Sequence, residues 1–172
     1  MVADININSK ELEAALNQAM SKIAQPALLM ESVAATLVSV TAQNFLAQGR
    51  PHWLGLKKPS DKRKGGMILQ DTGRLRDSIV GSHTDTSATI GSNVVYAAIH
   101  QFGGQTKPHV IAAKNGKALK FNGRYAKKVN HPGSKIPARP FLPVDGHGNL
   151  QAEAVSAIES VVQIYLRSVI GE

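Results

Sequence analysis

Hydrophobic spacing in the first 48 residues predicts two helices. Over residues 10–24, apolar side chains recur three or four positions apart, the spacing of one helix face. Pro26 favours the first turn of a second helix, because its missing N–H is not needed there. Gly49 and Pro51 predict where that helix ends. The expected core-facing positions of the second helix are Leu28, Leu29, Val33, Leu37, Val40, Ala42 and Phe45.

A third helix is predicted over residues 149–170. Glycines precede it, and Gly171 follows it, as is typical of helix boundaries. Its apolar positions again fall on one side. They are Leu150, Ala154, Val155, Ile158, Val161, Val162, Tyr165 and Val169.

Residues 49–66 are expected to form a loop, because glycine, proline and charged residues dominate them. We expect Trp53 to anchor this loop against the core, with its indole N–H paired. A short helix should start at Asp71 or Thr72. The residues expected to point inwards from this helix are Leu75, Ile79 and Val80.

Strand-like segments follow in the middle of the chain. Residues 82–90 and 94–100 favour two strands joined by a turn at 91–93. Farther along, residues 109–112 and 118–121 predict two strands joined by the Asn-Gly sequence within 114–117. A third strand is expected over Tyr125–Val129.

Helices at both ends and strands between them predict a single α+β domain over residues 1–172. Its parts are expected to be a small antiparallel β-sheet, packed against the N-terminal helices and the C-terminal helix, and a basic β-hairpin extension. The segments, in order, are helical 1–48, loop 49–66, helix-strand 67–104, basic hairpin and arm 105–140, and helix 149–170.

Composition narrows the classes of protein that fit this sequence. The chain has no cysteine, which excludes disulfides and thiolate metal sites. Apolar residues make up 42% and charged residues 19%, a globular balance. The polar, acidic N-terminus lacks the pattern of a secretory signal, and no apolar run is long enough to span a membrane. We therefore expect a soluble protein, made in the cytoplasm, with no membrane partner.

Positive charge is concentrated in the middle of the chain. The whole chain carries +8, but residues 49–143 hold 17 Lys and Arg against four Asp, a net +13. The two ends together carry −5. A basic centre with acidic ends predicts either an anionic partner or self-association through opposite charges.

Catalytic and metal-binding patterns are missing from the sequence. The six histidines show no spacing that brings two imidazoles onto one metal ion. Asp71 and Asp77 flank Arg74 and Arg76, which favours local ion pairing over acid–base chemistry. No nucleophile elbow, phosphate loop or dinucleotide motif occurs. The sequence predicts no enzyme and no cofactor.

Nucleic-acid binding is an alternative that the basic segment leaves open. Its cations interleave with Phe121 and Tyr125, which are suited to stacking on bases. The same lysines are also typical of an exposed hairpin that keeps sheet edges soluble. The candidate contacts to an anionic partner are Lys107, Lys114, Lys117, Lys120, Arg124, Lys127, Lys128 and Lys135.

Four sequence blocks together resemble a known family. They are residues 51–54 (PHWL), 68–79 (ILQDTGRLRDSI), 96–104 (YAAIHQFGG) and 136–142 (IPARPFL). In this order and spacing they are similar to the tail-completion, or virion morphogenesis, family of tailed bacteriophages.

The resemblance implies a structural virion protein that acts late in assembly. Family members finish the head-proximal end of the tail and allow stable joining to the filled head. Its partners would be other copies of itself in a ring and neighbouring tail and neck or connector proteins. It would be assembled in the host cytoplasm and end in the virion. The alternative is a basic nucleic-acid-binding module contacting the genome end in the neck.

The expected interface residues come from these blocks and from the arm at 136–142. Arg139 stands between two prolines, where an extended backbone is suited to projecting its guanidinium towards a neighbouring subunit. Phe141 and Leu142 either anchor that contact or pack back onto the protein's own core. The full set is Trp53, Arg74, Arg76, His100, Phe102, Arg139, Phe141 and Leu142.

Overall fold

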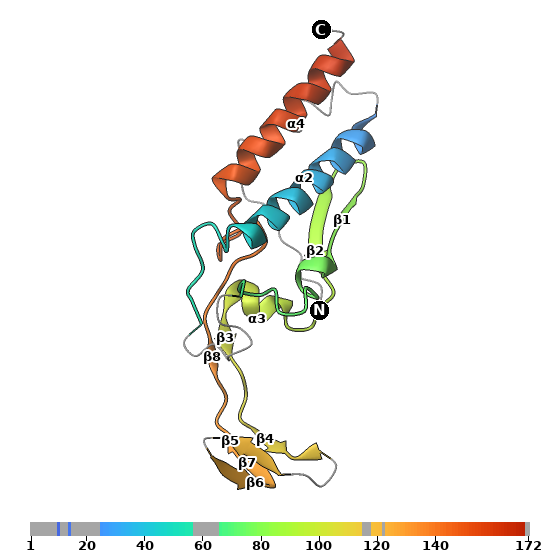
Figure 1. Cartoon of the computed structure of the whole chain (residues 1–172). Helices are drawn as coiled ribbons and strands as arrows, with labels where there is room; N and C mark the ends of the chain where they lie inside the picture. The colour runs from blue at the N-terminus through green and yellow to red at the C-terminus, as the bar shows by residue number, and fades with distance from the viewer. Residues whose placement is uncertain are drawn as a thin grey trace.

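The protein is elongated, with a helical body at one end and a narrow β-ribbon projecting from the other (Figure 1). This structure is a computed structural model, and it describes residues 10, 14, 25–56, 66–114, 118–121 and 123–170. The helix predicted over 10–24 lies outside the described residues except for Lys10 and Ala14, which are helical.

Two long helices form the body. Helix α2 (Pro26–Leu46) begins with its proline in the first turn, as predicted. Helix α4 (Ala152–Ile170) lies alongside it and packs against it (Figure 1). Two predicted core positions of α2 are wrong, because Leu28 is 49% exposed and Ala42 is also exposed.

Helix α4 starts three residues later than predicted, because a closed turn precedes it. The Asp145 carboxylate accepts hydrogen bonds from the backbone N–H groups of His147 and Asn149. The Gln151 N–H then donates to the Pro143 carbonyl at 3.0 Å. These bonds hold residues 145–151 in a conformation that is not helical. Buried Ala154, Ile158 and Val162 face the core.

A β-hairpin covers another side of α2. Strands β1 (Ile79–His83) and β2 (Ala88–Ser92) pair antiparallel and pack on that helix. The single strand predicted over 82–90 is therefore wrong. Its centre is the turn, because the Thr84 hydroxyl accepts hydrogen bonds from two backbone N–H groups, those of Thr86 and Ser87.

The residues before β1 form less helix than predicted. They contain one 3-10 turn, η2 (Arg76–Ser78), and no helix starts at Asp71 or Thr72. Leu75 is buried and Ile79 is half-buried, but Val80 is 66% exposed, so its inward orientation was wrongly predicted.

The strand predicted over 94–100 is wrong. That stretch enters helix α3 (Ala97–Phe102). Ala97 and Gln101, four positions apart, are its buried side chains, whereas Val95 is 99% exposed. Burial thus follows a helical period that the β-branched valines had obscured.

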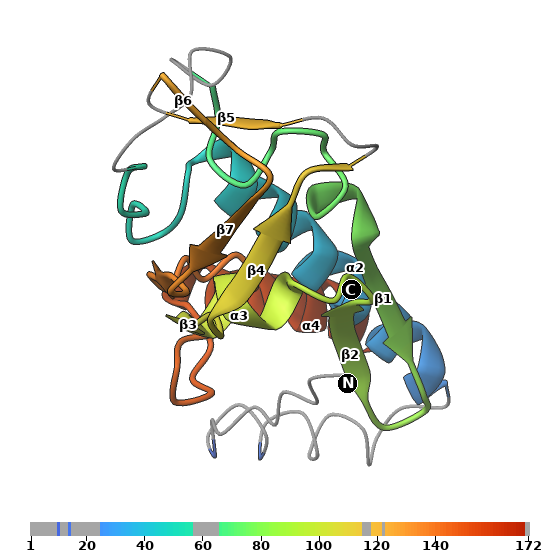
Figure 2. The same cartoon turned by 90° about the horizontal axis from the view of Figure 1, so that it is seen from below.

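The projecting ribbon consists of three successive antiparallel strand pairs, whose strands run out along one side and return along the other. Going out are β3 (Gly104–Gln105), β4 (His109–Ala112) and β5 (Leu119–Phe121), and returning are β6 (Arg124–Ala126), β7 (Lys128–His131) and β8 (Lys135–Ile136). Strand β3 pairs with β8, β4 with β7, and β5 with β6. Figure 2 shows β4 and β7 side by side.

The hairpin predicted between β4 and β5 is wrong, since these strands do not pair with each other. The chain contains two Asn-Gly sequences, and the first, at 115–116, lies outside the described residues. Of the second, at 122–123, only Gly123 is described, with φ +76°. Strand β5 pairs with β6, with Phe121 opposite Arg124. The strand predicted at Tyr125–Val129 is divided between β6 and β7.

The α+β class is confirmed. The described strands form four two-stranded antiparallel pairs, of which β1–β2 packs on the body and three make the ribbon. The core lies where α2, α4 and β1–β2 meet the segment at 141–144.

Candidate interaction surfaces

Arg139 is buried rather than projecting. Its backbone N–H donates to the His100 carbonyl at 2.7 Å. Its guanidinium Nε donates to the Leu54 carbonyl at 2.9 Å, and Nη2 donates to the Gly55 carbonyl at 3.3 Å. Only 5% of the residue is exposed. The expectation of an exposed fork is therefore wrong, because the guanidinium holds a loop of its own chain.

The aromatic residues beside Arg139 pack into the protein's own core. Phe141 is 1% exposed and its ring lies 5.5 Å from that of Phe45. Trp53 contacts Phe45 edge-on at 5.7 Å, and its Nε1–H donates to the Pro140 carbonyl at 2.8 Å. This confirms Trp53 as the anchor of its loop. Leu142 is 5% exposed, so packing onto the core is the alternative that the structure adopts for 141–142.

Gln101 holds that core segment in place. Its Oε1 accepts hydrogen bonds from the backbone N–H groups of Phe141 and Leu142, at 2.9 and 3.0 Å. Its Nε2 donates to the Val144 carbonyl at 3.1 Å. Sequence reasoning missed this residue, because its burial becomes visible only once the segment is known to be a helix.

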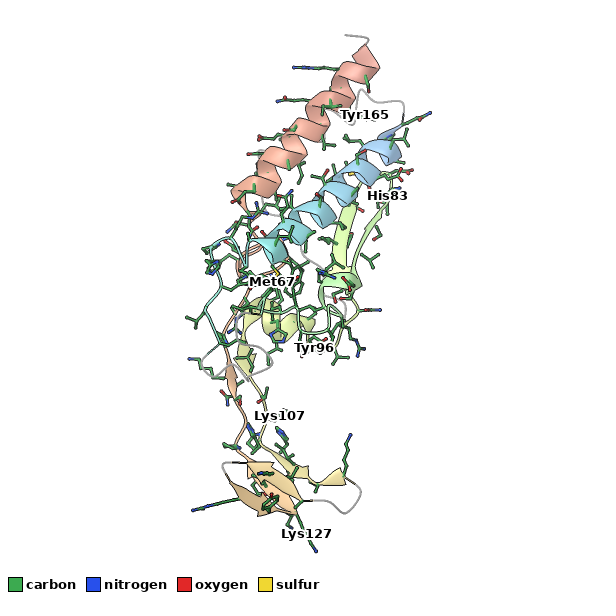
Figure 3. All side chains as sticks on the ribbon, in the orientation of Figure 1. Met67, His83, Tyr96, Lys107, Lys127 and Tyr165 are labelled. Carbon is green, nitrogen blue, oxygen red and sulfur yellow. The ribbon has the colours of Figure 1, made fainter. Side chains whose placement is uncertain are left out.

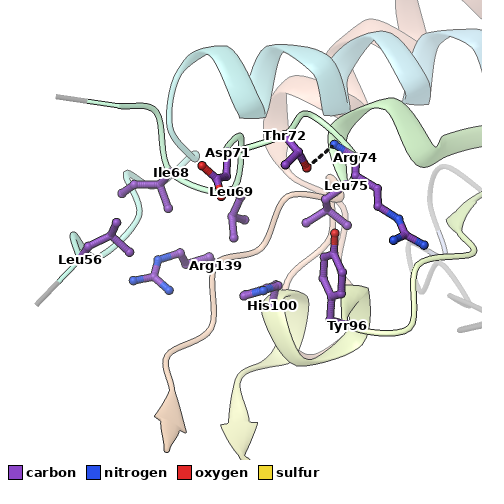
Figure 4. Close-up of a pocket in the computed structure, with 10 residues that line it drawn as sticks. All are labelled: Leu56, Ile68, Leu69, Asp71, Thr72, Arg74, Leu75, Tyr96, His100 and Arg139. Atoms are coloured by element: carbon purple, nitrogen blue, oxygen red, sulfur yellow. Dashed lines mark hydrogen bonds between the residues drawn. The ribbon is translucent and has the colours of Figure 1, made fainter. Parts of the chain in front are cut away.

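Three of the predicted interface residues meet in one cavity of about 300 Å³. Figure 4 shows the His100 ring between Arg139 and Tyr96, with leucine side chains above. The residues that line it come from α3, including its N-cap, and from the 68–75 stretch. Leu56, from the 49–66 loop, and Arg139, from the 136–142 segment, complete the lining. The lining residues are Leu56, Ile68, Leu69, Asp71, Thr72, Arg74, Leu75, Tyr96, His100 and Arg139.

The cavity lining carries two permanent cations, Arg74 and Arg139, and one carboxylate, Asp71. Burial, and then the positive charge of Arg139, lower the pKa of His100 below its usual value. Burial also lowers the pKa of Arg139. The Nδ1 atom of His100 is buried and has no hydrogen-bond partner among the described residues.

Two further predicted interface residues are exposed. Arg76 forms an ion pair with Asp77 at 2.7 Å, as the local charge pattern predicted, and Phe102 is 50% exposed at the end of α3. Their contact with other subunits stays a prediction.

The ribbon carries an exposed basic surface. Figure 3 shows the Lys107 and Lys127 side chains extending away from the ribbon. Among the predicted anionic-partner contacts, Lys117 lies outside the described residues. The seven others are all exposed, and they are Lys107, Lys114, Lys120, Arg124, Lys127, Lys128 and Lys135. We call this set the basic arm.

Aromatic and apolar side chains interrupt the basic arm. Tyr125 is 67% exposed, and the Lys120 ammonium lies 5.7 Å from the centre of its ring. Val110 is 59% exposed on β4. The side chain of Phe121 lies outside the described residues. An exposed, cationic two-stranded ribbon has little core of its own and is suited to lying against a partner.

In the described part of the chain, no three metal-ligating side chains come together. His109 and His131 stack with their ring centres 5.0 Å apart, where β4 pairs with β7. Among the helices that the structure describes, none combines the length and apolar character needed to span a membrane.

Comparison with known proteins places this sequence in a family. The model of the phage virion morphogenesis family matches residues 7–167. Mu-like prophage FluMu G protein 2 of Haemophilus influenzae is 38% identical over 135 residues, 78% of each chain. Putative capsid assembly protein G of Escherichia phage Mu is 27% identical over 97% of this chain and 99% of its own. No solved structure matches significantly. The chain belongs to the phage virion morphogenesis family.

Proposed function

We propose that this protein is a structural, non-enzymatic assembly component of a phage or prophage virion. It acts at the junction of tail and neck, where it completes the tail and allows stable joining to the head. The observation that carries the assembly role is the family match over residues 7–167. The relative in Escherichia phage Mu is named a putative capsid assembly protein, and this name supports a role in assembling the virion.

The basic arm supplies the means of docking. It extends from the folded body, so it can reach a neighbouring subunit while the body keeps its own core (Figure 1). Its seven described cations are all exposed, and residues 105–140 contain no acid. Such a surface attracts an acidic one, and the complementary charges speed association and select the register. In a ring of copies, each arm would meet the next subunit or the adjoining neck protein.

Disrupting the gene in its source phage or prophage tests the place of action. After induction, electron microscopy of the lysate should show full heads beside separate tails. Joined particles of normal appearance would contradict the proposal. Defective heads with normal tails would also contradict it, since they would move the function from the tail–neck junction to the capsid.

Charge reversal tests the docking mechanism. The double variant Lys127→Glu, Lys128→Glu should weaken association by roughly tenfold for each charge that meets a partner acid, and joined particles should fall accordingly. The control is Lys10→Glu, Arg167→Glu, which reverses two exposed cations away from the arm. Equal yields from both variants would refute a role for the arm.

Exposed Tyr125 beneath Lys120 favours a second candidate, contact with the genome end. Fluorescence anisotropy with a short DNA duplex distinguishes the two. Binding that is lost between roughly 50 and 200 mM salt, and lost in the Lys127→Glu, Lys128→Glu variant, would support DNA contact through phosphates. No binding at the lower salt concentration would exclude it.

A further inference from the structure

We propose that the cavity around Arg139 and His100 binds the carboxylate of an acidic side chain, presented on an apolar peptide segment of a neighbouring virion protein. The cavity opens between α3 and the 68–75 stretch (Figure 4). That the neighbour is a virion protein rests on the proposed function. Recognition of the carboxylate rests on the cavity alone.

Arg139 is the main reason to expect an anion. A guanidinium has five N–H donors. In Arg139, hydrogen bonds to carbonyls engage Nε and Nη2. Within the described residues, no carboxylate forms an ion pair with it. A buried cation without an opposite charge is costly, and an entering carboxylate would supply that charge.

The other charged groups of the lining leave a positive balance. Arg74 adds a second cation, and Asp71 is exposed and adds one negative charge. With His100 neutral, two cations and one anion give the described lining a net charge of +1. An anionic group is therefore the favoured guest, and a cationic one is disfavoured.

His100 gives the cavity a measurable response. Its ring lies edge-on to Tyr96, with ring centres 5.8 Å apart, and its pKa is held down by burial and by Arg139. Asp71 and Arg74 are the other charged groups among the described lining residues. A bound carboxylate would oppose the effect of Arg139 and raise the pKa of His100. Binding would therefore take up protons and strengthen as the pH falls.

The walls and the surroundings of the cavity favour a peptide over a free small anion. Leucine and isoleucine side chains line one side, from Leu56, Ile68, Leu69 and Leu75. Exposed apolar side chains adjoin the lining residues in the chain, Met67 beside Ile68 and Val95 beside Tyr96. Exposed apolar surface next to a charged cavity is typical of protein docking sites.

Titration of the isolated full chain tests the proposal. The probe is the peptide acetyl-Ala-Leu-Glu-Leu-Ala-amide, and its control is the same peptide with Gln in place of Glu. The His100 imidazole is followed by nuclear magnetic resonance at increasing peptide concentration and across pH. The Glu peptide should bind roughly tenfold to a hundredfold more tightly than the Gln peptide, because its carboxylate forms charge-assisted hydrogen bonds. It should also raise the pKa of His100.

A variant that blocks the cavity distinguishes peptide binding in the cavity from binding elsewhere on the surface. Thr72→Trp fills the cavity from an exposed lining position and should abolish binding of the Glu peptide. Thr86→Trp makes the same change in the β1–β2 turn and should leave it intact. Equal binding of both peptides, no change at His100, or unchanged binding by Thr72→Trp would each overturn the proposal. Because these measurements need no virion, they can fail while the assembly role stands, and the reverse also holds.

Discussion

Replacing Gln101 with leucine removes the side chain that joins α3 to the core segment at 141–144. The amide of Gln101 satisfies three backbone groups, which are two N–H donors and one carbonyl acceptor. The residue is 3% exposed, so water cannot replace the lost partners. Leucine has a similar volume and forms no hydrogen bond, and the change therefore isolates the polar interaction.

The expected loss of stability follows from those three groups. A buried backbone group left without a partner costs about 1–3 kcal/mol. The apolar leucine side chain returns on the order of 1 kcal/mol through burial. Three such groups cost about 3–9 kcal/mol, so the net decrease in the free energy of unfolding is about 2–8 kcal/mol, a large part of the 5–15 kcal/mol typical of a whole domain. At about 2–4 °C per kcal/mol for a chain of this length, the Tm should fall by roughly 4–30 °C.

Urea denaturation measures this effect directly. Trp53, the single tryptophan, is 4% exposed and reports unfolding of the same core by fluorescence. The control Gln163→Leu makes the same chemical change at an exposed position on α4 and should alter stability by less than about 0.5 kcal/mol. A decrease below about 1 kcal/mol for Gln101→Leu would refute the assignment of Gln101 as the clamp.

Three other substitutions test separate parts of the structure. Trp53→Phe removes the hydrogen bond to the Pro140 carbonyl and should cost about 1–2 kcal/mol, measured in urea by circular dichroism; unchanged stability would contradict the anchoring role. Gly133 has φ +89° and a Cβ there would overlap the Thr106 carbonyl oxygen, so Gly133→Ala should speed amide exchange in β4 and β7, whereas Gly146→Ala, in open space, should not. Because the pKa of His100 is lower in the folded state, the unfolded chain binds more protons, and stability should fall as pH drops through the usual value of 6.5 towards the folded pKa. His100→Phe should reduce this loss between about pH 8 and pH 5, and an unchanged loss would contradict the shift.

Local patterns predicted the long helices well. The apolar period, Pro26 at the start and Gly49 after the end together identify α2, and each of these signals acts within a few residues. Helix α3 was missed for the opposite reason. Its six residues give little periodicity, and what stabilises it is the contact of Gln101 with a segment some 40 residues later. Propensity carries no information about such a partner.

The pairing of the strands and the orientation of the Arg139 side chain also could not be predicted from local sequence patterns. Both Asn-Gly sequences satisfy the rule for a hairpin turn, and only the cross-strand register, with Phe121 opposite Arg124, shows that β5 pairs with β6 and not with β4. The prolines beside Arg139 predict an extended backbone, but they carry no information on the direction of its side chain. Where the guanidinium points depends on free carbonyls at Leu54 and Gly55, which lie more than 80 residues earlier.

The four blocks that carry the family resemblance form one connected unit. Trp53 donates to the Pro140 carbonyl, and Gln101 accepts from Phe141 and Leu142, so the first and third blocks meet on the fourth. The second block joins them through Leu75, which packs in the same core.

The basic arm stands outside this unit in space (Figure 1) and between the third and fourth blocks in sequence. A change within the unit should therefore act first on folding, and a change in the arm on docking alone. Charge reversal at Lys127 and Lys128 should impair head–tail joining without lowering the Tm, whereas Gln101→Leu should lower both the Tm and joining. This pair of results would assign folding to the four-block unit and docking to the basic arm.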